Sequence, residues 1–247
     1  MQETDIDATE NVDEFARDID QLRIIPLFNE ISEEKLKFIS NKIVYNWLDE
    51  NEKVLKQGDY LLSVFFIIRG HVHASYTSHS GKVIFMQEFG PGNMFGEVAA
   101  FDGHPSDATF EAREKTLIGT ISSSDYRAIC VHDQLIAEAA FHALAKRTRL
   151  LIRHLKELTT LGVHNRIHAE LLRRGRRGLI SNNTSEITPA PTHADIAFRV
   201  NTQREVVTKE LNHLEALGII KKTRSSIVIT CMVRLEALVE SAVGNRE

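Results

Sequence analysis

The sequence predicts an α+β protein with an N-terminal jelly-roll β-barrel, a long central helix and a C-terminal winged helix-turn-helix. Short apolar runs separated by turn residues fill positions 44–122, and a helical leucine repeat follows over positions 137–161. Two short helical segments and a β-prone pair of runs then occupy positions 187–230. At 247 residues, 43% of them apolar, the chain can build two separate cores.

The barrel prediction depends on spacing. Apolar runs such as KVLKQG, SVFFIIRG, HVHASY and KVIFMQEFG are separated by turn residues at 57–59, 69–70, 79–81 and 91–93. This pattern is typical of antiparallel strands in a small barrel or jelly roll. Before the first run, apolar residues at helical spacing over 31–43 predict a helix.

The central helix carries one narrow apolar stripe. Its residues follow each other at alternating steps of four and three, which is a coiled-coil seam of about three heptads. The opposite face is basic and is expected to be solvated. Such a stripe needs a second surface to cover it, so we expect a homodimer. The seam residues are Leu144, Thr148, Leu151, Leu155 and Leu158, and the basic ones are Lys146, Arg147, Arg149, Arg153 and Lys156.

The C-terminal part contains two short helices separated by only three or four residues around 199–201, which is helix-turn-helix spacing. Thr192 is expected to cap the first helix with Asp195, and Thr202 to cap the second with Glu205. The run IIKKTRSSIVIT that follows predicts a hairpin, or wing.

The second of these helices has an inward apolar face of Val207, Leu211 and Leu214. Its outward side chains suit base edges, because arginine binds guanine, glutamate accepts from cytosine, and lysine binds guanine or phosphate. The sequence therefore predicts double-stranded DNA as a partner, against the alternative of a merely solvated helix. The predicted reading residues are Thr202, Gln203, Arg204, Glu205, Thr208, Lys209 and Asn212.

Charge supports the same assignment. Residues 1–163 have 17 basic and 25 acidic side chains, a net −8, whereas residues 164–247 have 13 and 9, a net +4. A polyanion would therefore meet the C-terminal part. A basic turn either contacts phosphates or is simply solvated. It consists of Arg173, Arg174, Arg176 and Arg177.

Several classes of protein are disfavoured. No run of 18 uncharged apolar residues exists and the N-terminus is acidic, so we expect a cytoplasmic protein without a membrane span or secretory signal. Cys130 and Cys231 form no metal-binding spacing, and Cys130 fits a buried structural thiol better than a redox sensor. No phosphate loop or nucleophile elbow is present, which predicts no enzyme.

Two alternatives stay open. His71 and His73 lie two residues apart, with His79 nearby, and could ligate a metal in a cupin-like barrel. However, Val72 and Ala74 should face the interior, which would put both histidines outside and predicts no metal site. The other alternative is a barrel that binds a small molecule or a partner protein and uses the C-terminal part only for assembly.

Four segments resemble the Crp/Fnr family, which contains the cyclic-AMP receptor and the fumarate-nitrate regulator. They are GDYLLSVFFIIRGHVHASY, GPGNMFGEVAAFDGHPSDATFEA, the leucine helix ending LGVHNRI, and THADIAFRVNTQREVVTKELNHLEALGII. The resemblance covers nearly all of residues 21–230. It implies that Arg204 and Glu205 contact bases, that Lys209 stands where arginine is frequent, and that RNA polymerase is a partner.

The resemblance also implies an effector pocket. In nucleotide-binding members a segment like PGNMFGEVAAF meets the cyclic phosphate, and Gly96 and Glu97 match it. Where those members have arginine and a small residue, this chain has Ser106 and Asp107, and the adenine-binding polar pair aligns with Leu151 and Ile152. We therefore expect no cofactor and no cyclic AMP in the usual pose. Another small-molecule effector, or a cyclic nucleotide in an atypical pocket, stays possible.

These inferences divide the chain into four parts with a hinge near Gly162, through which a signal would reorient the DNA-reading domains. The parts are an acidic mobile leader at 1–20, a cyclic-nucleotide-binding-like sensor barrel at 21–133, a dimerisation helix at 134–163, and a winged helix-turn-helix DNA-binding domain at 164–247.

Overall fold

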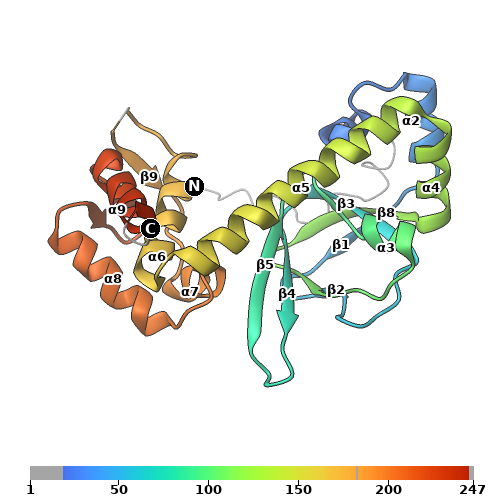
Figure 1. Ribbon diagram of the computed structural model, residues 1–247. Helices are drawn as coiled ribbons and strands as arrows, with labels where there is room; N and C mark the ends of the chain where they lie inside the picture. The colour runs from blue at the N-terminus through green and yellow to red at the C-terminus, as the bar shows by residue number, and fades with distance from the viewer. Residues whose placement is uncertain (1–18, 182, 245–247) are drawn as a thin grey trace, which may run out of the picture. The chain divides into compact units, whose positions relative to one another are not determined.

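The computed structural model describes residues 19–181 and 183–244, and it divides after Arg147 into two compact units (Figure 1). We call them the N-terminal unit and the C-terminal unit. The expected acidic leader lies outside the described residues, except for Ile19 and Asp20, which begin the 3-10 helix η1 (Ile19–Ile24).

The N-terminal unit is a jelly-roll-like sandwich of two four-stranded antiparallel sheets, ordered β1-β8-β3-β6 and β2-β7-β4-β5. The predicted jelly roll is confirmed, although the two sheets do not close into a barrel. The strands are β1 (Val44–Leu48), β2 (Lys53–Leu55), β3 (Ser63–Arg69), β4 (Val72–Thr77), β5 (Val83–Phe89), β6 (Met94–Phe95), β7 (Thr109–Ala112) and β8 (Thr116–Ser122).

Strand β3 explains the arrangement of the two cores. Residues 64–68 of β3, the run VFFII, are all apolar because both faces of the strand are buried there, one toward the opposite sheet and one toward the helices. Between the sheets, the ring of Phe95 stacks on Phe65 and on Phe110, with centroid distances of 4.9 and 4.5 Å. This aromatic stack ties strands of both sheets together.

Helices cover the other face of β3 and β8. The predicted N-terminal helix is confirmed as α2, whose first turn is capped by Ser32, and Ser122 caps α4 in the same way. These elements are η1, η2 (Pro26–Phe28), α2 (Glu33–Ser40), α3 (Glu97–Asp102), α4 (Ser123–His132) and the beginning of α5 (Gln134–Thr160).

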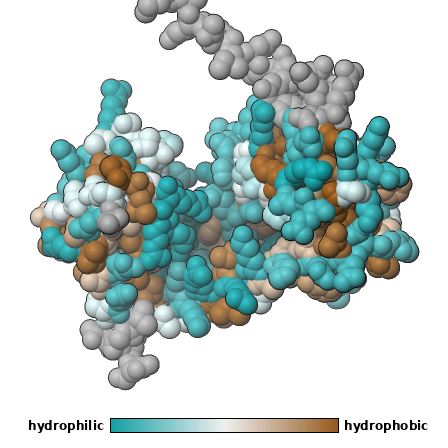
Figure 2. All heavy atoms as spheres, turned by 90° about the horizontal axis from the view of Figure 1, so that it is seen from above, coloured by the Kyte–Doolittle hydropathy of each residue, from teal (hydrophilic) through white to brown (hydrophobic). Residues whose placement is uncertain are grey.

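The predicted central helix is confirmed as α5, which has 27 residues and is the longest helix in Figure 1. Several of its apolar side chains are solvent-exposed, among them Phe141 at 72% and Leu155 at 62%. Figure 2 shows that apolar patches interrupt the otherwise hydrophilic surface on the face it displays. Exposed apolar groups along a long helix are what a coiled-coil partner would cover.

The C-terminal unit is a winged helix-turn-helix, as predicted. Its helices pack over a three-stranded antiparallel sheet of order β10-β11-β9, in which β10 and β11 form the predicted wing. The short third strand, β9, was not predicted. The elements are α6 (Val163–Gly175), β9 (Ser185–Ile187), α7 (His193–Arg199), α8 (Arg204–Ala216), β10 (Ile220–Lys222), β11 (Ile227–Ile229) and α9 (Met232–Gly244).

None of the helices in the described part of the chain is long and apolar enough to cross a membrane.

Candidate DNA interface and effector site

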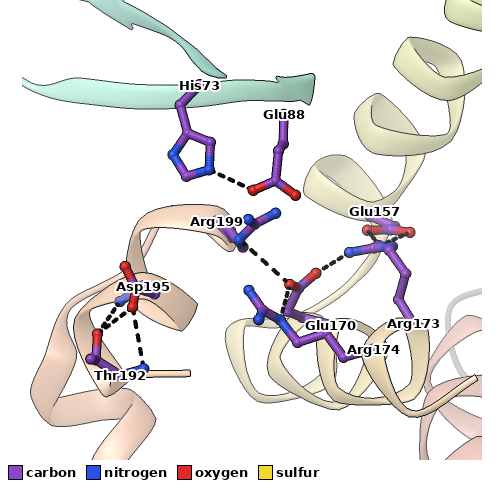
Figure 3. A network of polar contacts seen from close by, with 9 residues as sticks. All are labelled: His73, Glu88, Glu157, Glu170, Arg173, Arg174, Thr192, Asp195 and Arg199. Carbon is purple, nitrogen blue, oxygen red and sulfur yellow. Dashed lines mark hydrogen bonds and ion pairs between the residues drawn. The ribbon is translucent and has the colours of Figure 1, made fainter. Parts of the chain in front are cut away.

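The helix-turn-helix has one cap that was predicted correctly and one that was not. Thr192 and Asp195 form a reciprocal capping box at the start of α7 (Figure 3). At the start of α8, however, the N-cap is Gln203, without a side-chain cap bond, so the predicted role of Thr202 is wrong. Thr202 belongs to the turn instead, because its amide donates back to the carbonyl of Ala197 at 2.9 Å.

The turn before α8 is held by two further features. Asn201 has a φ of 53°, a left-handed conformation that asparagine tolerates better than most residues. The Arg166 side chain donates from Nε to the carbonyl of Val200 at 3.0 Å and from Nη1 to that of Leu161 at 3.1 Å. Arg166 thus fixes the turn to the beginning of α6, a contact that the sequence pattern did not reveal.

The two faces of α8 separate as predicted. Val207, Leu211 and Leu214 are fully buried in the core of the C-terminal unit. The opposite face exposes five of the predicted reading residues, whereas Thr202 and Thr208 are half-buried. The exposed ones are Gln203, Arg204, Glu205, Lys209 and Asn212.

Two of the predicted readers already have protein partners. The hydroxyl of Thr208 donates to the Arg204 carbonyl at 3.0 Å and lies 2.7 Å from Nδ1 of His193. Asn212 accepts from Nζ of Lys222, on the wing strand β10, at 2.5 Å. Lys222 therefore attaches the wing to α8, and the exposed charges Arg204, Glu205 and Lys209 are the more available readers.

The basic turn is mostly neutralised within the C-terminal unit. Figure 3 shows Glu170 between Arg173 and Arg174, with Arg173 also bound by both oxygens of Glu157 at 2.8 and 2.7 Å. Arg176 pairs with Glu236 at 2.6 Å. Three of the four arginines are thus paired with carboxylates rather than simply solvated, and a phosphate at this turn would compete with those pairs.

In the N-terminal unit, the candidate effector segment has a strict requirement for glycine. Gly96 has a φ of +89° and precedes α3. A Cβ there would lie 2.5 Å from Cδ2 of Leu61 and 2.8 Å from the carbonyl oxygen of Ser63. Only glycine fits this close approach, so Gly96 fixes where the next side chain, Glu97, is placed.

Glu97 is only 2% exposed and is bound by Nη1 of Arg147 on α5. The guanidinium of Arg147 also lies over the ring of Phe89, 4.6 Å from its centroid. The expectation of a solvated basic face on α5 is therefore wrong for Arg147. The other oxygen of Glu97, Oε2, is buried without a hydrogen-bond partner among the described residues.

Ser106 and Asp107, the other predicted effector residues of the N-terminal unit, lie in the loop between α3 and β7. Ser106 donates from its hydroxyl to the Ala108 carbonyl at 2.8 Å, and its backbone pairs with Gly58 and Asp59. The carboxylate of Asp107 is exposed. Leu151 and Ile152 are exposed on the part of α5 that belongs to the C-terminal unit.

The histidine pair differs from expectation. His73 is buried rather than outside, and its cross-strand neighbour Glu88 binds its Nε2 at 2.7 Å. His71 pairs with Glu114 at 2.6 Å. Across residues 19–181 and 183–244, no group of three or more His, Cys, Asp or Glu side chains is arranged to hold a metal ion.

Comparison with known proteins agrees with this geometry. The cyclic nucleotide-binding domain model matches residues 46–133, and the Crp-like helix-turn-helix domain model matches residues 165–238. The chain is 24% identical over 213 residues to the cyclic AMP receptor protein of Thermus thermophilus, covering 86% of this chain and 96% of that protein.

Two further proteins are similar over most of the chain. A CRP-like cAMP-activated global transcriptional regulator of Mycobacterium tuberculosis is 26% identical, covering 74% of this chain and 82% of that protein. The structure of FixK2 from Bradyrhizobium japonicum superposes with a TM-score of 0.67 at 20% identity, covering 79% and 96% of the two chains. The two domain models, their order and these relatives together show that the chain belongs to the Crp/Fnr family of DNA-binding transcription regulators.

Proposed function

We propose that this regulator is a cytoplasmic homodimer that reads an inverted-repeat operator through the first turns of α8. The observation that carries the proposal is the set of exposed charges at 204, 205 and 209, on a helix whose opposite face is completely buried. The buried face fixes the helix, so the exposed face is free to enter a major groove.

The chemistry of the three side chains differs. Arg204 can bind O6 and N7 of guanine with two donors, and Glu205 can accept from the amino group of cytosine. Lys209 offers a single charged group and cannot reproduce the two-pronged contact of arginine. We therefore expect the strongest base preference opposite Arg204 and Glu205, and a weaker one opposite Lys209.

Dimerisation would come from the seam on α5. Leu151 and Leu155 are exposed at 43% and 62%, which is unusual for large apolar side chains on a helix unless a partner covers them. A two-fold dimer presents two copies of α8 about one duplex turn apart, so the two half-sites should be inverted. An activating role would add a contact with RNA polymerase.

For the effector, we favour a small molecule other than cyclic AMP. The relatives from Thermus thermophilus and Mycobacterium tuberculosis are described as a cyclic AMP receptor and a cAMP-activated regulator. Here Ser106 has an uncharged side chain bonded to its own loop, and the adjacent carboxylate of Asp107 would repel a phosphate. A cyclic phosphate would thus lose a charge-assisted contact and meet a like charge.

The test of DNA reading is a binding measurement on an operator selected from random duplexes. Arg204→Ala should lower operator affinity by about 1–3 kcal/mol and relax the preference at one position of each half-site. Arg176→Ala is the matched control, because it removes an exposed arginine of the same unit that pairs with Glu236. Equal losses for both variants would refute base reading by Arg204.

A further inference from the structure

The buried face of α8 contains one carboxylate. Glu210 is 5% exposed and lies on the same side of the helix as the fully buried Val207, Leu211 and Leu214. It directly follows Lys209, one of the exposed candidate readers. Burying a carboxylate costs free energy unless the carboxylate is paired, so the partner of Glu210 matters for the position of α8.

That partner comes from α6. Nε2 of His168, a residue that is 5% exposed, lies 2.6 Å from Oε1 of Glu210. The other oxygen, Oε2, lies 3.6 Å from Nδ1 of the more exposed His164, one turn earlier on α6. One carboxylate of α8 therefore faces two histidines on one side of α6, the helix that begins next to the proposed hinge at Gly162.

The hydrogen bond between His168 and Glu210 has a defined donor and acceptor. Burial lowers the pKa of His168 below its ordinary value in spite of the Glu210 carboxylate, and the charges of His164 and His213 act in the same direction as burial. The imidazole is then neutral near pH 7, and its Nε2–H donates to the carboxylate. Its Nδ1 is buried with no hydrogen-bond partner in the described part of the chain.

Stability alone does not explain this pair. Two apolar side chains of similar volume would hold α6 and α8 together at least as well as a buried polar pair. Apolar contacts, however, tolerate small rotations of a helix, whereas a short hydrogen bond requires both distance and angle. A rotation of α8 would move Arg204 and Lys209 relative to the bases.

We propose that His168 and Glu210 are positioning residues for DNA recognition, whose buried bond sets the rotation of α8 on α6. This inference rests on the proposed function, because it concerns the same reading helix. Its consequence is that operator preference, rather than DNA affinity in general, depends on the pair.

The inference also predicts an effect of pH. Protonating His168 would add an N–H donor at Nδ1, which has no acceptor among the described residues, and a positive charge near His164 on its own helix and His213 on α8. The preference for operator over random DNA should therefore fall as pH drops from 7.5 to 5.5. Burial also lowers the pKa of His193, which contacts Thr208 on α8. His193→Asn is therefore the control that removes this second titrating group.

The experiment compares wild type, Glu210→Gln and the double variant His168→Leu/Glu210→Leu by operator affinity, random-DNA affinity and thermal midpoint. The double variant should keep the midpoint while its operator-to-random ratio falls by about tenfold and loses the part of its pH dependence that His193→Asn leaves in place. Glu210→Gln, whose amide oxygen still accepts from Nε2–H, should keep the ratio at pH 7.5 within about twofold of wild type.

Two results would overturn this inference and leave the proposed function intact. One is a folded double variant with the wild-type ratio, and the other is a Glu210→Gln ratio as low as that of the double variant, since the bond would then not be the cause. The Gln variant keeps the test valid if the double variant does not fold. A wild type without any operator preference would overturn the proposed function, and this inference with it.

Discussion

In each unit of the molecule a buried glutamate is bound by a basic side chain from another helix, but the basic residue differs between these two pairs. In the N-terminal unit Glu97 is bound by Arg147, and in the C-terminal unit Glu210 is bound by His168. Arginine stays charged at any physiological pH, whereas histidine titrates near neutrality. The first pair is therefore a fixed attachment, and the second can respond to protons.

The sign of that response follows from the pKa. Burial lowers the pKa of His168 in the folded protein below its unfolded value near 6.5. As pH falls below about 6.5, the unfolded chain binds the proton more readily, so the C-terminal unit loses stability. Above that range the contribution of His168 is fully present.

The largest effect that separates the two pairs should come from Arg147→Ala. It leaves the Glu97 carboxylate buried without its cation and should destabilise the N-terminal unit by about 3 kcal/mol. Trp47, the single tryptophan, packs on the core of that unit, so its fluorescence during urea unfolding reports this unit alone.

The matched control is Arg149→Ala, which removes an exposed arginine from the same helix. It should change stability by no more than about 0.5 kcal/mol. If the two variants unfold at the same urea concentration, the buried ion pair is not a stabilising attachment.

The next largest effect is expected at the seam of α5. Leu155→Glu places a charge on the exposed apolar stripe of α5 and should weaken dimerisation by about 2 kcal/mol, or about 30-fold, in sedimentation equilibrium. Phe38→Glu changes an equally exposed apolar residue on α2 and should leave the dimer intact. A dimer that survives Leu155→Glu unchanged would place the interface elsewhere.

A smaller effect is expected at the proposed hinge. Gly162 has φ and ψ of −62° and 162°, and an added Cβ would meet only Nδ2 of Asn165 at 3.9 Å, so alanine fits without strain. Gly162→Ala should stabilise the folded chain by no more than about 1 kcal/mol while changing operator affinity by restricting the hinge. Unaltered operator affinity, and an unaltered response to any effector, would rule out the hinge role.

The smallest expected effect is that of cyclic AMP. With Ser106 and Asp107 in the loop after α3, calorimetry should detect no binding at micromolar nucleotide, and operator affinity should not change. Micromolar binding would show that the N-terminal unit accepts the nucleotide without the expected arginine.

The sequence predicted those features that depend on neighbouring residues. The strands of the N-terminal unit, the long helix α5, the Thr192–Asp195 box and the buried stripe of α8 all follow from periodicity or from a cap three residues away. The cap predicted at Thr202 was nevertheless wrong, because Thr202 belongs to the turn and α8 begins after Gln203.

What could not be predicted are pairings between distant residues. Arg147 and Glu97 are 50 positions apart, and His168 and Glu210 are 42 apart. Nothing in the local pattern distinguishes Arg147 from the solvated basic residues around it. His73 was misplaced for the same reason, since its partner is Glu88 on the neighbouring strand.

The most direct test of the account is a pair of selections from a random duplex library, one without ligand and one with cyclic AMP at a concentration that saturates cAMP-activated relatives. Operator reading by Arg204 without cyclic AMP should give the same inverted repeat in both selections, with Arg204→Ala losing it. An inverted repeat enriched only with cyclic AMP, or an enriched site that Arg204→Ala still selects, would contradict it.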